Sequence, residues 1–333
     1  MCIRDRFISC GDALVDLFIC DGLLDVAASA YNSGESKPGK LCLHGGAGGS
    51  PMNVACGLAR LGHKSEYFTS LSRDIFGDRI RDYLTQNQVG YSLCADTDLN
   101  TTLAIIDTQA DGSAKYVFHR NATADVSISK DDLPEELSPS VKAIHLGSYC
   151  AVVEPSASAL IALAKRESKR TVISYDPNVR NTFESDLDKW RQSFATLSSM
   201  ATVVKASDED IVLLYGSGAS QQQRFIDDCL SAGASLVFVT QGAEGAIACA
   251  QDGRRESTSV MATSVVDTVG AGDSFQAALL HWLAVSNCLE GATINTDGVD
   301  LSACLHFAVS AASVTCSRAG ADLPHLEDLR LST

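Results

Sequence analysis

The sequence contains no apolar run long enough to cross a membrane. No stretch of its 333 residues approaches the roughly 18 apolar residues that a spanning helix needs. The N-terminus also lacks a basic segment followed by a sustained apolar one, which argues against a secretory signal. We therefore expect no membrane partner and take the cytoplasm as the default location, while an organellar address lost with the native N-terminus stays open.

Basic residues are also scarce. The 26 lysines and arginines are outnumbered by 41 aspartates and glutamates, which gives a formal net charge of −15, and no Lys/Arg-rich run occurs. Because nucleic-acid binding depends on clustered positive charge that meets the phosphate backbone, we expect no nucleic-acid partner. Any anionic ligand must instead meet a local positive site.

Paired cysteine motifs are missing, although the chain has 12 cysteines. They are scattered, with neither a CxxC pair nor the spacing of zinc ligands. The chain is also long enough to fold without disulfide bonds. We expect reduced structural thiols rather than a disulfide framework.

A regular alternation of patterns is what the chain does contain. With 45% hydrophobic residues, its length allows one large α/β domain or two smaller ones. From about residue 141 onward, short β-rich runs such as "VKAIHLGS", "TVISYD" and "SLVFVTQG" alternate with longer helical patterns such as "PSASALIALAKRES". This order is typical of βαβ units and predicts a mostly parallel sheet with helices on both faces.

The first 140 residues follow a different pattern. "FISCGDALVDLF" predicts a strand, and "NVACGLARLG" predicts a helix with an apolar stripe, closed by Gly62. Further strand-like segments, "KLCLHGG" and "TTLAIIDTQADGSAKYVFHR", predict a β-rich lid built from two separate pieces, approximately residues 13–47 and 91–121. The opening "MCIRDR" fits this pattern poorly, so we treat residues 1–6 as an addition to the native chain.

The stretch "DTVGAGDSF" combines a tight turn, a helix start and an acid. Gly270 and Gly272 free the backbone to turn, and a helix that starts near Asp273 leaves its first amides without partners. Such amides, at the positive end of a helix dipole, attract anions. A plain turn with Asp273 or Ser274 capping the helix is the simpler alternative. The stretch fits neither a P-loop nor the dinucleotide GxGxxG pattern, which disfavours a Rossmann enzyme.

This stretch closely resembles the C-terminal signature of the ribokinase-like, or PfkB, family of sugar and nucleoside kinases. "GGSPMNVACGLARLG" resembles the N-terminal signature of that family, and "GDALVDL", "VVKASDED" and "VTQGAEGAIA" resemble other family segments in order. "YDPNVR" and "FHRNATAD" are similar to segments of fructokinases and 2-keto-3-deoxygluconate kinases. The resemblance implies a single kinase domain over residues 1–333, a three-layer α/β/α sandwich around a mostly parallel sheet with a small β lid.

The resemblance also implies roles for individual residues. Asp273 would be the general base that takes a proton from a sugar hydroxyl, and the amides of Gly270, Ala271 and Gly272 would form the anion hole. The implied sugar-binding residues are Asp16, Gly48, Gly49, Asn53, Arg120 and Arg180. The implied nucleotide-binding residues are Lys205, Ser207, Thr240, Gly242 and Gly245, with Asp210 as an indirect metal contact.

Several of these assignments have a simpler structural alternative. An acid beside a strand, such as Asp16, is more often a solvated turn residue, and isolated arginines such as Arg120 and Arg180 more often lie on the surface. The glycines of "VTQGAEGAIA" also suit a hairpin between two strands. Ser207 and Asp210 stand where the family commonly has Asn-x-x-Glu, and they equally suit a helix N-cap followed by first-turn acids.

The implied activity is that of an ATP-dependent sugar kinase that uses Mg²⁺, with fructose as the leading substrate and fructose 6-phosphate as the product. A 2-keto-3-deoxygluconate kinase or another sugar kinase stays open as an alternative. An inactive kinase-like binding or regulatory protein also stays open, although the intact "GAGD" argues against it. "TCSRAGA", residues 315–321, resembles a turn beside the adenine pocket and a carbonyl-lined cation site, which implies activation by K⁺. We further expect a homodimer formed through the lid.

Overall fold

A central sheet of eight strands organises the molecule. The computed structural model describes residues 5–20, 42–108, 114–260 and 264–330. The strands of the central sheet are β1 (Arg6–Cys10), β4 (Lys64–Phe68), β9 (Val141–Gly147), β10 (Val172–Asp176), β11 (Val203–Ser207), β12 (Leu236–Thr240), β13 (Ala246–Ala250) and β14 (Arg255–Thr258). Their order is β14-β13-β12-β11-β10-β9-β1-β4, and all neighbours from β12 to β4 run parallel. Among the described strands of this sheet, only β13 runs antiparallel to its neighbours, β12 and β14, so the predicted mostly parallel sheet is confirmed.

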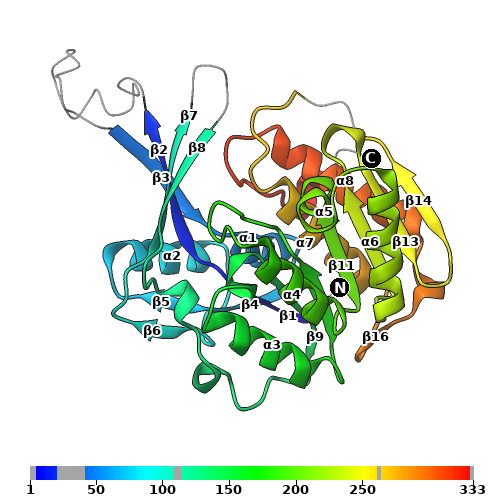
Figure 1. Ribbon diagram of the computed structural model, residues 1–333, viewed down its shortest axis with the longest axis horizontal. Helices are drawn as coiled ribbons and strands as arrows, with labels where there is room; N and C mark the ends of the chain where they lie inside the picture. Colours follow the sequence, from blue (N-terminus) through cyan, green and yellow to red (C-terminus); the bar gives the residue numbers. More distant parts are fainter. Residues whose placement is uncertain (1–4, 21–41, 109–113, 261–263, 331–333) are drawn as a thin grey trace.

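Helices cover both faces of this sheet (Figure 1). One layer holds α3 (Ser156–Glu167), α4 (Leu187–Ser198), α5 (Asp208–Tyr215) and α6 (Ala219–Ala232), and the other holds α1 (Ser50–Arg60), α7 (Ala271–Val285) and α8 (Leu301–Cys316). Side chains of a strand point alternately to its two faces. In β12, Val237 and Val239 accordingly join the core under the first layer, while Leu236 and Phe238 join the core under the second. The three-layer arrangement that the sequence predicts is therefore present.

A second sheet of four strands projects from the central one (Figure 1). Its strands are β2 (Leu14–Cys20), β3 (Cys42–Gly48), β7 (Thr102–Thr108) and β8 (Ala114–His119), paired in the order β3-β2-β7-β8. We call these four strands the lid. They come from two distant pieces of chain, and the expected "ADG" turn between β7 and β8 lies outside the described residues. The pieces are separated in sequence by α2 (Ile75–Gln86) and by the two strands of a small sheet, β5 (Ser70–Ser72) and β6 (Ala95–Thr97).

The prediction of one strand for "FISCGDALVDLF" is wrong, because the segment forms β1 in the central sheet and β2 in the lid. The chain breaks at Gly11, whose φ of +147° suits glycine and where a Cβ would lie 2.7 Å from Pro51 Cγ. Both halves are apolar, so the hydrophobic pattern runs across the break without marking it. Strand β1 begins at Arg6, which pairs with Lys64 of β4.

The remaining elements complete the second helical layer. A short ribbon of β15 (Leu289–Glu290) and β16 (Thr293–Ile294) lies between α7 and α8 in the chain, and α9 (Leu326–Arg330) packs against α8. Helix α7 packs against both α1 and α8 and is buried along most of its length, its first-turn acid included. This burial holds the start of α7 in a fixed position beside the sheet.

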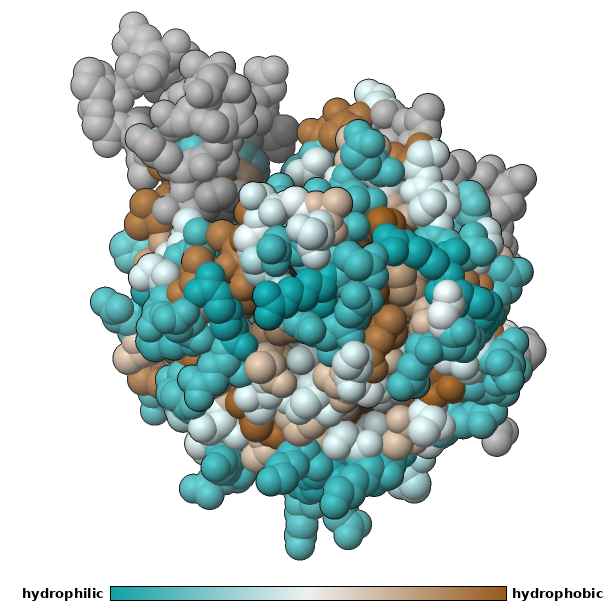
Figure 2. Space-filling view, turned by 45° about the vertical axis from the view of Figure 1, so that its right-hand side comes forward, coloured by the Kyte–Doolittle hydropathy of each residue, from teal (hydrophilic) through white to brown (hydrophobic). Residues whose placement is uncertain are grey.

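The exterior agrees with the composition. Hydrophilic side chains dominate the face in Figure 2, and apolar ones form separate small groups. Among the described helices, none is both long and apolar enough to cross a bilayer. The ten cysteines whose side chains the structure describes are all free thiols.

Candidate active site

The predicted residues lie where parallel strands end. Asp176 ends β10, Ser207 ends β11 and Thr240 ends β12. In a parallel sheet these carboxyl ends share one edge, which is where open α/β folds bind ligands. The start of α7 reaches the same edge, because a Cβ added to Gly272 would lie 2.9 Å from Lys205 Nζ of β11. The sheet edge and a helix N-terminus therefore meet at one place.

Asp273, in the first turn of α7, is held by two side chains of α1. Ser50 Oγ donates a hydrogen bond to one carboxylate oxygen at 2.6 Å, and Asn53 Nδ2 donates to the other at 2.8 Å. The N-cap of the helix is Gly270, in a left-handed conformation with φ of +80° and with no side chain capping the helix, so the capping alternative is wrong. Burial raises the pKa of Asp273, and the two hydrogen bonds oppose that rise. The result is a fixed carboxylate that can take a proton from a bound hydroxyl.

The amides at the start of α7 are only partly available to an anion. The N–H of Ala271 donates to the Thr268 carbonyl at 3.2 Å, which occupies one of the three predicted donors. Within the described residues, the N–H groups of Gly270, Gly272 and Asp273 have no backbone acceptor. These amides lie at the positive end of the α7 dipole, where an anion is favoured. The candidate anion site therefore consists of the N–H groups of Gly270, Gly272 and Asp273, rather than of the predicted set that includes Ala271.

Lys205 and Asp176 form a buried ion pair directly beneath this helix start. Their Nζ and Oδ2 atoms are 2.8 Å apart, and the two residues are only 4% and 2% exposed. Burial is the largest influence and alone would lower the pKa of Lys205, but the Asp176, Asp210 and Asp273 carboxylates together outweigh it and the pKa is raised. The lysine therefore carries a positive charge beside Gly272, in a protein that is otherwise strongly acidic. Lys205 is therefore the candidate for the local positive site that an anionic ligand requires.

Asp16 connects the lid to the same site. It lies within lid strand β2 opposite the glycine-rich β3, and a Cβ added to Gly48 would lie 2.3 Å from its Oδ2 atom. Burial raises the pKa of Asp16 to about 6, while the charge of Arg180 lowers it and that of Asp273 raises it. Asp16 is thus not the solvated turn residue of the simpler alternative. Asp16 of the lid is near enough to Arg180, after β10, and to Asp273 of α7 for their charges to affect its pKa, so these three elements border the same site.

Gly49 and Asn53 shape the start of α1. Gly49 has φ of +125°, and a Cβ there would lie 2.2 Å from the Asp12 carbonyl oxygen, so only glycine allows this approach. Asn53 donates to Asp273 through Nδ2, while its Oδ1 atom is buried with no partner among the described residues. A buried oxygen of this kind is available to a hydroxyl of a ligand.

The two predicted arginines come from different sides of the site. Arg120 follows lid strand β8, and its guanidinium lies 4.7 Å from the ring centroid of Phe183. Arg180 is exposed in the loop after β10, and within the described residues its guanidinium donates only to the neighbouring Val179 carbonyl, at 3.3 Å. Within the described chain neither arginine forms an ion pair, although both lie among acidic residues. Their donors are therefore free for a ligand.

Ser207 and Asp210 form a capping box at the start of α5. Ser207 N and Oγ both donate to Asp210 Oδ2, at 2.9 and 2.7 Å, and the Asp210 N–H returns a bond to Ser207 Oγ. Asp210 Oδ1 accepts from Val179 N at 2.7 Å. The cap alternative is thus correct, and each oxygen of Asp210 already has a donor. No group of three His, Cys, Asp or Glu residues in the described segments is arranged to hold a metal ion.

Thr240, Gly242 and Gly245 belong to a tight connection between β12 and the antiparallel β13, as the hairpin alternative expects. Gly242 and Gly245 have φ of +52° and +100°. A Cβ on Gly245 would lie 1.9 Å from the Thr258 carbonyl oxygen of β14, which explains the need for glycine. The connection lies at the sheet edge that carries Ser207, since Thr240 pairs with that residue.

Two site residues were missed by the sequence analysis. Ser50 was quoted only within a signature, and Asp176 only within "YDPNVR", yet one holds Asp273 and the other holds Lys205. A signal for Asp176 existed, because the acid that ends β10 and a lysine within the next buried strand fall side by side when the two strands pair in parallel, as Tyr175 does with Val204. No comparable signal links Ser50 to Asp273, which is 223 residues away.

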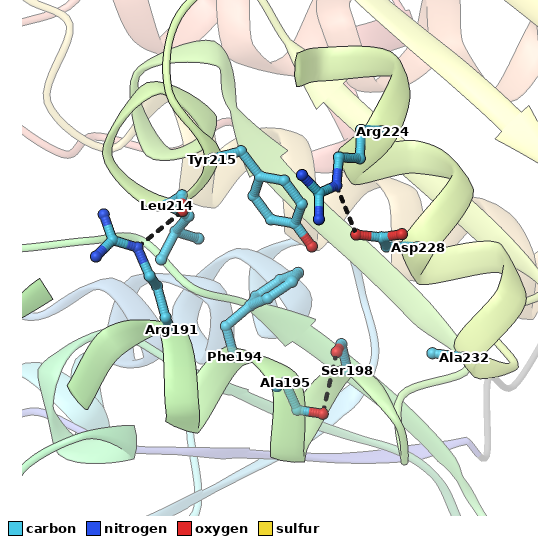
Figure 3. Close-up of a pocket in the computed structure, with 9 residues that line it drawn as sticks. All are labelled: Arg191, Phe194, Ala195, Ser198, Leu214, Tyr215, Arg224, Asp228 and Ala232. Atoms are coloured by element: carbon cyan, nitrogen blue, oxygen red, sulfur yellow. Dashed lines mark hydrogen bonds and ion pairs between the residues drawn. The ribbon is translucent and has the colours of Figure 1, made fainter. Parts of the chain in front are cut away.

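A distinct cavity of about 430 Å³ lies in the opposite helical layer, between α4, α5 and α6 (Figure 3). Phe194 and Tyr215 point into it, and its two arginines are already engaged: Arg191 bonds the Leu214 carbonyl and Arg224 pairs with Asp228. None of the predicted site residues lines it. The candidate active site is therefore defined by the strand ends and the start of α7, not by this cavity.

Comparisons with known proteins agree with this geometry. Residues 17–328 match the family described as pfkB family carbohydrate kinase. A fructokinase of Rhizobium leguminosarum bv. trifolii is 33% identical over 282 residues, covering 85% of this chain and 81% of the relative. A probable fructokinase-5 of Arabidopsis thaliana is 31% identical over 278 residues, covering 82% and 83%.

Solved structures show the same fold. A fructokinase from Xylella fastidiosa with bound ATP has a TM-score of 0.84 at 22% identity, with 99% of this chain and 98% of that chain covered. A Vibrio cholerae fructokinase variant with fructose, ADP and a potassium ion has a TM-score of 0.79 at 23% identity, with 99% of both chains covered. The sandwich is therefore ribokinase-like, as the resemblance implied. Together these matches show that the chain belongs to the pfkB family of carbohydrate kinases, phosphotransferases that act on a sugar hydroxyl.

Proposed function

We propose that this kinase transfers the γ-phosphoryl group of ATP to fructose, forming fructose 6-phosphate, with Asp273 as the general base. The observation that carries the proposal is the Asp273 carboxylate, fixed by Ser50 and Asn53 beside amides that lack acceptors. The choice of sugar is supported by the relatives named fructokinase and by the two arginines without ion pairs. A 2-keto-3-deoxygluconate kinase remains the alternative that a substrate panel separates.

Asp273 and the amides at the start of α7 have different chemical roles. The carboxylate accepts the proton of the attacking hydroxyl, while the amides of Gly270 and Gly272 face the charge on the transferred group. The ammonium group of Lys205, paired with Asp176, lies beside Gly272 and would face the phosphates as a cationic donor. Phosphoryl transfer needs little covalent help from the protein, so this positioning and charge stabilisation supply most of the rate acceleration.

The sugar is expected between the lid and α1. Asp16 would accept hydrogen bonds from its hydroxyls, and the free Oδ1 atom of Asn53 would accept another. Gly48 and Gly49 let the backbone approach the sugar closely, since neither carries a side chain. Arg120 and Arg180 would donate from the two sides of the site. On the nucleotide side we keep Lys205, Ser207, Thr240, Gly242 and Gly245 as the contacts.

The metal ions are expected to act through the nucleotide and through carbonyl groups. Mg²⁺ keeps several waters and binds substrate phosphates with few protein ligands, so Asp210, whose oxygens already have donors, would contact it only through water. For K⁺ we propose the contact between the end of α8 and the loop before α7. There the Cys316 carbonyl accepts from Val266 N, and Asp267 Oδ2 accepts from Gly320 N at 2.8 Å.

A dimer through the lid and a cytoplasmic location complete the proposal. Strands β3 and β8 form the lid edges, and their outward side chains include Leu43 and Val117, which are 40% and 56% exposed. Exposed edge strands with apolar side chains favour pairing with a second chain.

The test of the substrate is the initial rate of ADP release with Mg-ATP and a panel of sugars. Fructose, 2-keto-3-deoxygluconate, ribose, glucose and adenosine are compared, each with and without K⁺. We expect the highest kcat/KM with fructose and a higher rate with K⁺. Preference for another sugar would replace fructose while leaving the role of Asp273 intact, and no turnover with any sugar would contradict the kinase assignment.

The proposal also predicts that the kcat/KM for fructose decreases at acid pH. Since the pKa of Asp16 is raised to about 6, its carboxylate becomes protonated as the pH falls through that value and loses its charge for the sugar. The kcat/KM for fructose should therefore fall on the acid side of about pH 6, because this parameter reports groups of the free enzyme. In Asp16→Asn we expect a lower kcat/KM at neutral pH and no inflection near pH 6. An unchanged inflection in the variant would assign it to another group.

A further inference from the structure

We infer that Phe183 is a positioning residue for the sugar site, whose ring fixes the Arg120 guanidinium and so determines affinity for the sugar but not for the nucleotide. The inference rests on the proposed function, because it takes Arg120 as a sugar contact. It assigns a task to a residue in the loop after β10 that no sequence signature marked.

The Arg120 guanidinium is held by a ring rather than by an acid. Its carbon Cζ lies 4.7 Å from the centroid of Phe183, within the range of a cation–π interaction. Among the described residues the guanidinium makes no hydrogen bond or ion pair, although the chain has 41 acidic residues. A cation–π contact fixes the plane of the group while its five N–H donors stay unused. An arginine held in this way is ready to donate to a ligand.

Phe183 itself is rigidly packed. It is 1% exposed, the Tyr149 ring stacks on it with centroids 3.6 Å apart and planes inclined by 9°, and Phe118 of β8 meets it edge-on at 5.5 Å. Tyr149 follows β9, so the ring of Phe183 stands between the central sheet and the lid. A ring packed in this way has little free space around it and can therefore serve as a rigid support for Arg120.

The same cluster secures the base of the lid. The Tyr149 hydroxyl donates to the fully buried Asp125, and Thr102 Oγ1, at the start of lid strand β7, donates to the same carboxylate at 2.6 Å. Lid strand β7 is thus joined through Asp125 and Tyr149 to Phe183, while lid strand β8 reaches Phe183 through Phe118. Both strands of this hairpin are anchored to one aromatic ring.

Phe183 also shares a turn with the other predicted sugar arginine. The Phe183 N–H donates to the Arg180 carbonyl at 2.8 Å, and the Trp190 indole of α4 donates to the Glu184 carbonyl at 2.8 Å, which braces the turn. One braced turn therefore carries Arg180 and the support of Arg120. Because Arg180 and Phe183 belong to the same braced turn, the guanidinium groups of Arg180 and Arg120 are held at a defined separation.

The experiment compares Phe183→Leu, Phe183→Tyr and Phe225→Leu in steady-state assays with fructose and ATP varied separately. Phe225 is a matched control, because it is equally buried but packs with Phe194 and Tyr215 in the α4–α6 layer. We expect Phe183→Leu to raise the KM for fructose by about 5- to 30-fold, as the loss of a partly desolvated cation–π contact implies, with the KM for ATP unchanged. Phe183→Tyr keeps the ring face beside Arg120, so its KM for fructose should lie well below that of Phe183→Leu, although the added hydroxyl is buried and costs some stability.

A double-mutant cycle with Arg120→Gln isolates the contact. If the ring acts through the arginine, Phe183→Leu should have almost no further effect on the fructose KM in the Arg120→Gln background. Hydrogen exchange gives a readout without turnover: amides at the end of β8 should exchange faster in Phe183→Leu and normally in Phe225→Leu.

Three results would overturn the inference. These are a wild-type fructose KM in Phe183→Leu, an equal rise in the KM values for fructose and ATP, or independent effects of the two substitutions in the cycle. A wild-type enzyme that turns over no sugar would defeat the proposed function and the inference with it. A wild-type enzyme active on fructose, with Phe183→Leu equally active, would defeat the inference alone.

Discussion

Asp273→Asn should reduce kcat on the order of 10²–10⁴-fold, because an amide cannot accept the proton of the attacking hydroxyl. The fold should survive the change. The Asp273 oxygens accept from Ser50 Oγ and Asn53 Nδ2, and a Ser hydroxyl can turn to accept from the new amide. Removing a buried carboxyl whose pKa is raised by burial should not lower the free energy of unfolding appreciably.

The measurements are ADP release at saturating fructose and ATP, nucleotide binding by calorimetry, and thermal unfolding. Asp78→Asn is the matched control, since Asp78 is also an acid in the first turn of a helix but is exposed on α2. The control should leave all three quantities unchanged. Turnover of Asp273→Asn at the wild-type rate would exclude Asp273 as the base and leave the start of α7 as a nucleotide site only.

The sequence predicted those parts of the fold in which apolar residues recur with a clear period along the chain. From Val141 to Thr240, each buried strand is a short apolar run, and α3, α4 and α6 each bury one apolar face, so the order of elements predicted the sheet. The sequence did not show that the chain changes sheets at Gly11, because the apolar runs of β1 and β2 follow each other closely. The break depends on the contact of Gly11 with Pro51 of α1, which exists only in the folded chain. Which strands pair in the lid was likewise not visible, since β2 pairs with β7 across 88 residues, from Leu14 to Thr102.

The site could be predicted where a local motif carries the chemistry. A glycine turn followed by an acid identifies Asp273 because the helix start and the acid are neighbours in sequence. The contacts that make the site work are not neighbours: Ser50 reaches Asp273, Lys205 reaches Asp176, and Phe183 reaches Arg120 only in the folded chain. The motif also does not reveal that the Ala271 N–H donates a hydrogen bond to the Thr268 carbonyl, because this bond depends on the exact geometry of the turn.

Lys205→Met should affect both stability and catalysis. The substitution leaves the Asp176 carboxylate buried without its counter-ion, which typically costs about 3–5 kcal/mol in the free energy of unfolding. It also removes the positive charge beside Gly272, and loss of one such stabilising group lowers kcat by on the order of 10²–10³-fold. Urea unfolding and ADP release measure the two effects separately.

The double variant Lys205→Met, Asp176→Asn separates the structural role of the lysine from its catalytic role. With both charges gone, position 176 no longer holds an unpaired buried carboxylate, so most of the lost stability should return. The amide oxygen that replaces the carboxylate can still accept from Asn178 N, as the Asp176 side chain does at 3.1 Å. Turnover should stay low, because the charge that faces the phosphates is still missing. Recovery of both stability and turnover would mean that Lys205 serves only to neutralise Asp176, and the anion site would then depend on the amides of α7 alone.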